Sequence, residues 1–484
     1  ATDVGAYNVA VGGQAMLNNV DGSRNTALGY GTLQNMDPAS AVDTYNVAVG
    51  FNAGLSVSTG AENVLVGGNA GDALTTGTYN VALGTNALGA EDTGSRNTAI
   101  GHAALSGLDY AGNSYNTAVG FWAGLSVSTG IRNTLVGGLA GDSLTSASYN
   151  TALGMFALSS ETGGGNNTAI GYGALEIQNL NADSNNTAVG HLAGQLMASG
   201  TGNTLLGAFA GDAAMTGVDN TFVGLSSGTS NLGGDRAVGV GGYTLANNTT
   251  GSRNIAIGHG ALQTNQEGSY SVAIGYSALN AQNPSGAANM YNTAIGHEAG
   301  KLVSTGTQNT IMGGLAGDAL TTGMNNIAIG YNALGAEDAD SCNIAIGAHA
   351  LEDQNSTAGT AYNIGVGHAA GRNITTGTAN TIIGGLAGDA LTTGSDNVVL
   401  GYNALSAEDT GSRNTAIGRG SLQNLNYNGN GYNVAVGYEA GNDITTGTSN
   451  TLIGALSGDA LTDGNSNTAI GIRTLSAETR GDRN

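Results

Sequence analysis

The chain has 484 residues, a formal net charge of −22, 84 glycines and two prolines. A chain this acidic repels nucleic-acid phosphates and anionic membranes, so we expect neither as a partner. No apolar stretch is long enough to predict membrane insertion. The single cysteine, Cys342, excludes an intrachain disulfide framework.

One pentapeptide, Asn-x-Ala-Val/Ile-Gly, recurs 27 times along the sequence, mostly at intervals of 17 residues. A fixed period of this size indicates a solenoid in which each repeat is one coil stacked on the last. We therefore expect an all-β, parallel β-solenoid (a β-roll) of about 27 coils, forming one continuous body over residues 1–484. Steps of about 4.8 Å per coil predict a rod on the order of 125 Å.

The repeat from Asn97 to Gly101 shows how one coil is organised. Side chains alternate along a strand, so Thr98 and Ile100 share one face while Asn97 and Ala99 share the other. Seven residues after each asparagine comes a position, such as Ala104, that admits only Ala, Ser or Thr. Such small residues predict a thin cross-section, which we interpret as two short strands per coil. Stacking also predicts a ladder of asparagine amides, which in the first nine coils comprises Asn8, Asn25, Asn46, Asn63, Asn80, Asn97, Asn116, Asn133 and Asn150.

A thin roll cannot bury both faces of its strands. The remaining β-branched positions would form an exposed apolar stripe along the chain, which soluble monomers avoid. We expect association through this stripe, with three identical chains around one axis. The predicted interface residues are Val11, Ile100, Val119, Val136, Ile170 and Val189.

The coils also come in sets of four, and extra residues enter almost only after the fourth coil of a set. Loops inserted on one side of a solenoid are its usual interaction surface, although they are equally interpretable as neutral spacers. The chain itself we interpret as a segment of a longer fibre protein. The inserted loops fall near residues 34–45, 106–115, 176–185, 280–291, 352–362 and 423–432.

No catalytic, cofactor-binding or metal site is predicted, and we do not expect an enzyme. Histidines recur singly at a turn, one or two residues after a coil glycine. Aspartates such as Asp72 and Asp142 are roughly 19 Å or more apart, too far for a paired-carboxylate site. Acidic pairs such as Glu91-Asp92 are expected to be solvated turn charges. Calcium bridging such turns is a minor alternative, because their oxygens suit it. The histidines are His102, His191, His259, His297, His349 and His368.

The unit Asn-Thr-Ala-Ile-Gly-Tyr-x-Ala-Leu followed by a Thr-Gly turn resembles the repeats of phage tail fibres. It is also similar to the β-roll heads of trimeric autotransporter adhesins, and the resemblance covers practically the whole chain, from Tyr7 to Asn484. The resemblance implies a left-handed homotrimer with an extracellular location, on a virion or a cell surface. The chain departs from the adhesin heads in its longer coil, and we expect it to differ from them also in carrying no stalk or anchor.

The function we expect is a stiff structural fibre that attaches to a host or surface, most simply a viral (phage) tail fibre. Its receptor would be a host-surface glycan or protein that the repeats do not identify. The alternative is a bacterial cell-surface adhesin or an extracellular matrix filament. An ice-binding array and a polysaccharide-acting β-helix enzyme fit less well. The threonine column switches freely to valine, and no groove of clustered carboxylates is evident.

Overall fold

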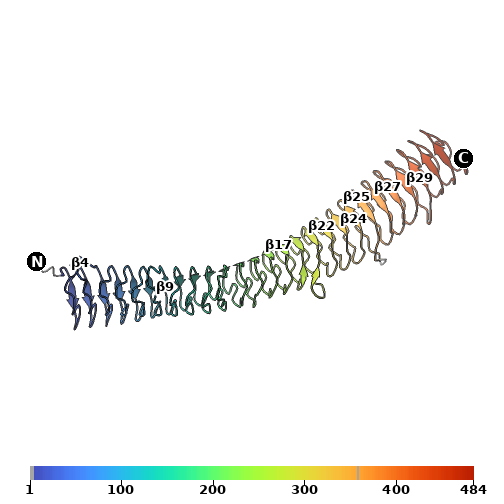
Figure 1. Cartoon of the computed structure of the whole chain (residues 1–484). Helices are drawn as coiled ribbons and strands as arrows, with labels where there is room; N and C mark the ends of the chain where they lie inside the picture. The colour runs from blue at the N-terminus through green and yellow to red at the C-terminus, as the bar shows by residue number, and fades with distance from the viewer. Residues whose placement is uncertain (1–4, 357–358) are drawn as a thin grey trace. The chain divides into compact units, whose positions relative to one another are not determined.

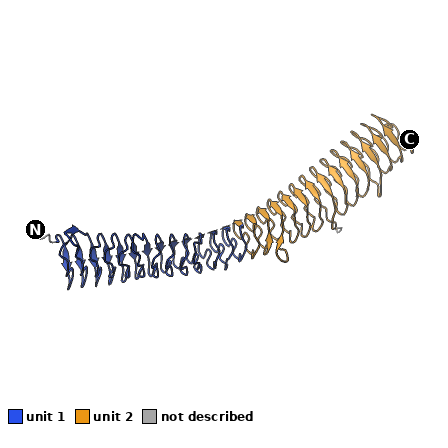
Figure 2. Ribbon diagram, in the orientation of Figure 1, with its two compact units in different colours: residues 1–237 blue, residues 238–484 orange. Residues whose placement is uncertain are grey.

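The structure, a computed structural model, describes residues 5–356 and 359–484. All of the regular structure in this part of the chain is β, and it contains no helix. The chain divides into two compact units, residues 1–237 and residues 238–484 (Figure 2). That the two form one continuous body stays a prediction, and each is described separately below.

The first unit carries three-residue strands at intervals of one coil, together with two short strands of two residues. Its strands are β1 (Val9–Val11), β2 (Gly22–Ser23), β3 (Thr26–Leu28), β4 (Val42–Asp43), β5 (Val47–Val49), β6 (Val64–Val66), β7 (Val81–Leu83), β8 (Thr98–Ile100), β9 (Thr117–Val119), β10 (Thr134–Val136), β11 (Thr151–Leu153), β12 (Thr168–Ile170), β13 (Thr187–Val189), β14 (Thr204–Leu206) and β15 (Thr221–Val223).

The second unit repeats this organisation, again with two short strands that pair with each other. Its strands are β16 (Val238–Val240), β17 (Ile255–Ile257), β18 (Gly268–Ser269), β19 (Val272–Ile274), β20 (Ala288–Asn289), β21 (Thr293–Ile295), β22 (Thr310–Met312), β23 (Ile327–Ile329), β24 (Ile344–Ile346), β25 (Ile364–Val366), β26 (Thr381–Ile383), β27 (Val398–Leu400), β28 (Thr415–Ile417), β29 (Val434–Val436), β30 (Thr451–Ile453) and β31 (Thr468–Ile470).

Within each unit, successive three-residue strands pair in parallel and in register (Figure 1). Ala99 of β8 lies beside Ala118 of β9, so that like residues of neighbouring coils stack in columns. The predicted all-β, parallel β-solenoid with a mostly 17-residue repeat and about 27 coils is confirmed. The pairing follows from the strict period, because each coil offers its neighbour the same strand at the same place.

The core is narrow and lies behind the sheet. The middle strand residue, such as Ala99, is buried in every coil after the first, and Ala104 of the small-residue column is fully buried. Leu105 follows it into the interior. Alanine and leucine therefore fill the space between the strand and the opposite limb of each coil, as the small-residue column predicts.

The expectation of two strands per coil is wrong. Each coil has one three-residue strand, and the opposite limb is built from turns in which alternate residues have positive φ. Ala103 and Leu105 have φ of 53° and 50°. The Ala103 N–H donates to Thr85 O of the preceding coil at 2.9 Å, and the Leu105 N–H donates to Ala123 O of the next coil at 3.0 Å. These bonds to both neighbouring coils compensate for a backbone conformation that disfavours most side chains.

The coil glycine is required by close stacking. A Cβ at Gly67 would collide with the carbonyl oxygen of Gly84 in the next coil, and its φ is +141°. At the adjacent Gly68 the nearest atom would be Thr85 Cγ2, at 3.9 Å. The two neighbouring glycines therefore form a matched pair for substitution.

We expect Gly67→Ala to lower the free energy of opening of the two coils that contain β6 and β7 by roughly 3 kcal/mol or more. Gly68→Ala should stay within about 0.5 kcal/mol of wild type. Hydrogen exchange of the β6 and β7 amides measures both, because it reports each coil separately. Equal effects of the two substitutions would show that close stacking does not impose the glycine.

The inserted loops contain the additional pairings. Short strands β4 and β20 lie in the loops near 34–45 and 280–291. Isolated parallel bridges join Ser95 to Asn113, Ser341 to Thr360 and Ser412 to Asn430. Residues 357–358 of the loop at 352–362 lie outside the described residues. A second strand-like contact thus forms just before the repeat asparagine, where a loop lengthens the coil.

Candidate functional site

The asparagine column forms a hydrogen-bonded ladder that is interrupted at Ala237 and Ser271, and its contacts differ from simple amide stacking. Asn133 Oδ1 accepts the backbone N–H of Asn150 at 3.0 Å. Its Nδ2 donates to Asn116 Oδ1 at 3.2 Å and to the Ala147 carbonyl at 2.9 Å. Each amide thus ties its own coil to both neighbours, and the side chain is fully buried. The same backbone-to-side-chain bond joins the successive predicted residues Asn8, Asn25, Asn46, Asn63, Asn80, Asn97, Asn116, Asn133 and Asn150.

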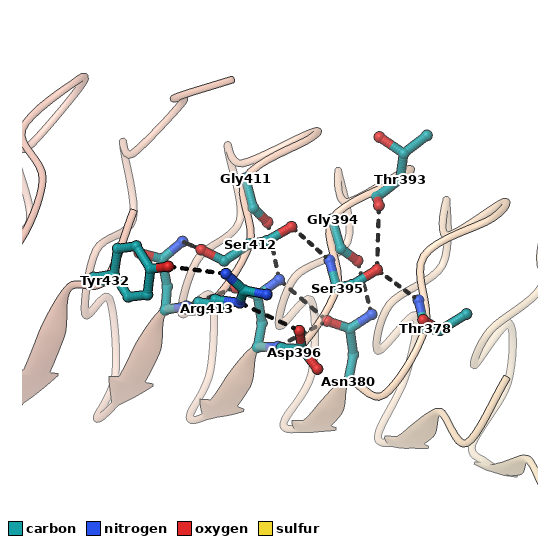
Figure 3. A network of polar contacts seen from close by, with 12 residues as sticks. Thr378, Asn380, Thr393, Gly394, Ser395, Asp396, Gly411, Ser412, Arg413 and Tyr432 are labelled. Carbon is teal, nitrogen blue, oxygen red and sulfur yellow. Dashed lines mark hydrogen bonds and ion pairs between the residues drawn. The ribbon is translucent and has the colours of Figure 1, made fainter. Parts of the chain in front are cut away.

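A second ladder lies two residues before the asparagine (Figure 3). Ser395 Oγ accepts the Thr378 N–H at 3.0 Å, and Ser412 Oγ accepts the Ser395 N–H at 2.9 Å. Beside it, Arg413 Nη1 donates to the Tyr432 hydroxyl at 2.8 Å. Sequence reasoning missed this ladder, although the recurrent Ser, Asp or Asn at this position is its signal.

The exposed face of the sheet is the candidate interaction surface. The predicted interface residues all point to this face: Val11 is 54% exposed, and the other members are half-buried in the single chain. The first and third residues of all 27 three-residue strands are Thr, Val, Ile, Leu or Met. No charged side chain therefore lies on this face, although the chain has a net charge of −22. The other predicted members are Ile100, Val119, Val136, Ile170 and Val189.

Tyrosine and arginine side chains recur directly before the repeat asparagine, along one border of this face. Arg96 lies between the Tyr79 and Tyr115 rings, with its guanidinium carbon 5.1 and 5.5 Å from their centroids. Exposed cation–π contacts of this kind contribute about 0.5–1 kcal/mol each. Most arginines of the chain occupy this column, together with acidic residues such as Glu62, Asp219 and Asp396. Its arginines are Arg24, Arg96, Arg132, Arg236, Arg253, Arg413 and Arg483.

Rings also stack along the other border, in the slot that follows the coil glycine. Tyr276 lies between His259 and His297, with centroids 5.7 and 5.3 Å apart and nearly parallel planes. Phe121 stacks similarly between His102 and Trp122. Most histidines in this column therefore contact an aromatic neighbour, which agrees with a slot selected for flat rings.

One contact brings two histidines together. The His349 and His368 rings meet edge to face at 6.1 Å, although His349 lies one residue further from its glycine than the other histidines do. His349 Nδ1 is 2.9 Å from Glu352 Oε2, which also binds Arg372 Nε at 2.8 Å. Burial alone would raise the pKa of Glu352, but Asn332, His349 and Arg372 together lower it. This carboxylate balances the local positive charge.

The expectation that the acidic pairs are solvated is wrong for their glutamates. Glu91, Glu337 and Glu408 are fully buried. Glu91 lies near Asp92 and Asp109, with one oxygen of each within 4.8 Å of the others. Both oxygens of Glu91 accept backbone N–H groups, from Gly94 and Tyr110, which assigns this carboxyl to its turn. The alternative of calcium at the acidic turns stays a prediction.

The aspartates of the second coils are half-buried in turns. Desolvation raises the pKa of five of them, including Asp72, despite bonds from backbone N–H groups. Thr229 also donates its hydroxyl to Asp212 and lowers that pKa in part. They recur every four coils, or six coils between Asp212 and Asp318, so they do not gather into a single site. The aspartates with a raised pKa are Asp72, Asp142, Asp212, Asp318 and Asp389.

In comparisons with known proteins, no protein-family model and no curated protein matches the chain. In the described ranges, 5–356 and 359–484, no helix is long and apolar enough to cross a membrane. The fold defines the chain as a parallel β-solenoid of repeated coils, and its function is argued from its surfaces below.

Proposed function

We propose that the chain forms the shaft of a structural fibre whose identical chains associate through the exposed face of the sheet. The observation that carries this proposal is the absence of charge from that face in all 27 three-residue strands. Chains with a net charge of −22 repel each other, so close approach favours the one surface that carries no charge. Covering half-exposed aliphatic side chains then supplies the driving force.

Three chains around one axis are the arrangement we propose. In a trimer, each face meets both other chains, so the whole stripe is covered without leaving an open apolar edge. The inserted loops project from turns that precede the strand and stay outside such an interface. The loops are then free to contact a host-surface glycan or protein, and many weak contacts along one fibre would combine into strong attachment.

A viral tail fibre is the setting we propose first, with a bacterial surface adhesin or an extracellular matrix filament as the alternative. Both use a repetitive rod, and the described coils support the two equally. The neighbouring genes discriminate between them, because virion genes travel together whereas an adhesin is encoded with its own anchor and secretion signal.

The mass of the protein in solution tests the association. Light scattering should give three times the chain mass of 47.5 kDa. Electron microscopy of the same sample should show rods on the order of 125 Å, the length of 26 steps of about 4.8 Å. A stable monomer at micromolar concentration would contradict the proposal and assign the aliphatic face to another role.

A further inference from the structure

One core position, seven residues after the coil glycine, is filled by apolar residues in most coils. Leu74 and Leu108 occupy it in the first and third of three successive coils and are fully buried. Glu91 occupies the same position in the coil between them and is equally buried. A carboxyl group therefore replaces an aliphatic side chain inside the solenoid, where an unpaired charge is strongly disfavoured.

Polar residues appear at this position immediately before every inserted loop. The six loops near 34–45, 106–115, 176–185, 280–291, 352–362 and 423–432 each follow a coil with Asn or Glu there. Four of the six residues are glutamates, and all four are fully buried. Because a polar residue stands at this position before each of the six loops, we connect the position with the loop of the next coil. In chain order, the residues are Asn19, Glu91, Glu161, Asn265, Glu337 and Glu408.

The contacts of Glu91 explain the link. One oxygen accepts the N–H of Gly94 in its own turn at 2.5 Å, and the other accepts the N–H of Tyr110 in the inserted loop at 3.4 Å. The carboxyl group thus bridges the turn of one coil and the loop of the next.

Glu408 repeats this arrangement one unit further along the chain. Its oxygens accept the N–H of Gly411 at 2.7 Å and the N–H of Tyr427 at 3.2 Å. Tyr427 lies in the loop near 423–432, as Tyr110 does in its own loop. The bridge is therefore a property of the coil set rather than of a single site.

Burial makes the charge of these groups sensitive to pH. The pKa of Glu91 is raised to about 7, mainly by desolvation and less by Asp109 and Asp92, against the lowering effect of the two N–H bonds. The coil before it presents only Leu74 at this position. Desolvation also raises the pKa of Glu408, with a smaller contribution from Asp409. For Glu91, the folded pKa exceeds the unfolded value of 4.5, so the stabilisation is complete below about 4.5 and is lost as pH rises through about 7.

We propose that Glu91 and Glu408 fasten the inserted loops 106–115 and 423–432 in a proton-dependent manner. The neutral carboxyl is accommodated in the core and holds the loop against the preceding turn. The ionised carboxylate is disfavoured there, so the loop opens more often and solvates it. Protonation of these glutamates would control how often the two loops open, whether or not the chains associate.

The loop near 280–291 provides an internal comparison. The preceding coil has Asn265 in the same position, fully buried. Its amide donates to the Gly268 carbonyl at 2.9 Å and accepts from Gln282 Nε2 at 3.1 Å. A primary amide does not titrate over this range, so this loop should be fastened equally at acidic and alkaline pH.

Hydrogen exchange of the full chain at pH 5 and pH 8, corrected for intrinsic rates, tests the proposal. Protection of the Gly94 and Tyr110 amides should fall roughly 10- to 100-fold at pH 8, while residues 280–291 change little. Glu91→Gln should abolish the pH dependence at 106–115 and leave that of 423–432 intact. A flat wild-type profile at both glutamate loops, or a Glu91→Gln profile like wild type, would overturn it. If Glu91→Gln does not fold, the test is the wild-type chain alone: exchange at 106–115 and 423–432 should depend on pH, and exchange at 280–291 should not.

Discussion

Ile100→Asp, Val119→Asp and Val136→Asp, introduced together, should convert the proposed trimer into monomers while the coils stay folded. The three side chains lie in successive coils on the uncharged face and are half-buried in the single chain. Burying a carboxylate without a partner costs several kcal/mol, and the three chains would bring nine of them to one axis. The same substitutions cost the isolated chain little, because each new carboxylate can reach water.

The measurement is the mass by light scattering, with circular dichroism to show that the β-structure is retained. A matched variant places the same three charges on exposed turns away from the sheet, as Thr76→Asp, Thr129→Asp and Ser146→Asp. This variant should remain a trimer at the same concentration. A trimeric face variant would show that the interface lies elsewhere, and dissociation of both variants would point to net charge rather than to the face.

The sequence determines the coil count and the register because both depend on columns of like residues. The repeated asparagine and the small residue at positions such as Ala104 fix which atoms stack, and the structure places both in the core. The side-chain alternation around Ala99 follows from strand geometry alone. These features repeat in every coil, so comparing the coils with one another is enough to predict them.

The opposite limb and the buried glutamates were less predictable, for physical reasons. Leucine and alanine rarely adopt positive φ, so nothing in Ala103 or Leu105 indicates the alternating conformation that bonds each coil to both neighbours. Glutamate beside aspartate usually indicates a solvated turn. The signal that could have placed Glu91 inside is positional: its neighbours in the same column are leucines.

Asn133→Ala should open the solenoid locally and produce the largest loss of stability among single side-chain truncations at the ladder. The substitution removes the acceptor of the Asn150 N–H and the donor to the Ala147 carbonyl, both in the buried interior. Each buried polar group left without a partner costs about 1–3 kcal/mol, so we expect a loss of roughly 3–5 kcal/mol in the opening free energy.

Because the coils contact only their neighbours, the effect should concentrate in β9, β10 and β11 and decline within a few coils on either side. Hydrogen exchange of these strand amides measures it, since a single global unfolding temperature averages over a repeat array. Asn247→Ala, at an exposed asparagine outside the ladder, should change protection by no more than about 0.5 kcal/mol. If the two variants behaved alike, the stacked strands and the apolar core would hold the coils together without the ladder. A loss confined to Asn133→Ala would instead show that asparagine recurs because its amide serves the backbone of two coils at once, which neither alanine nor aspartate can do.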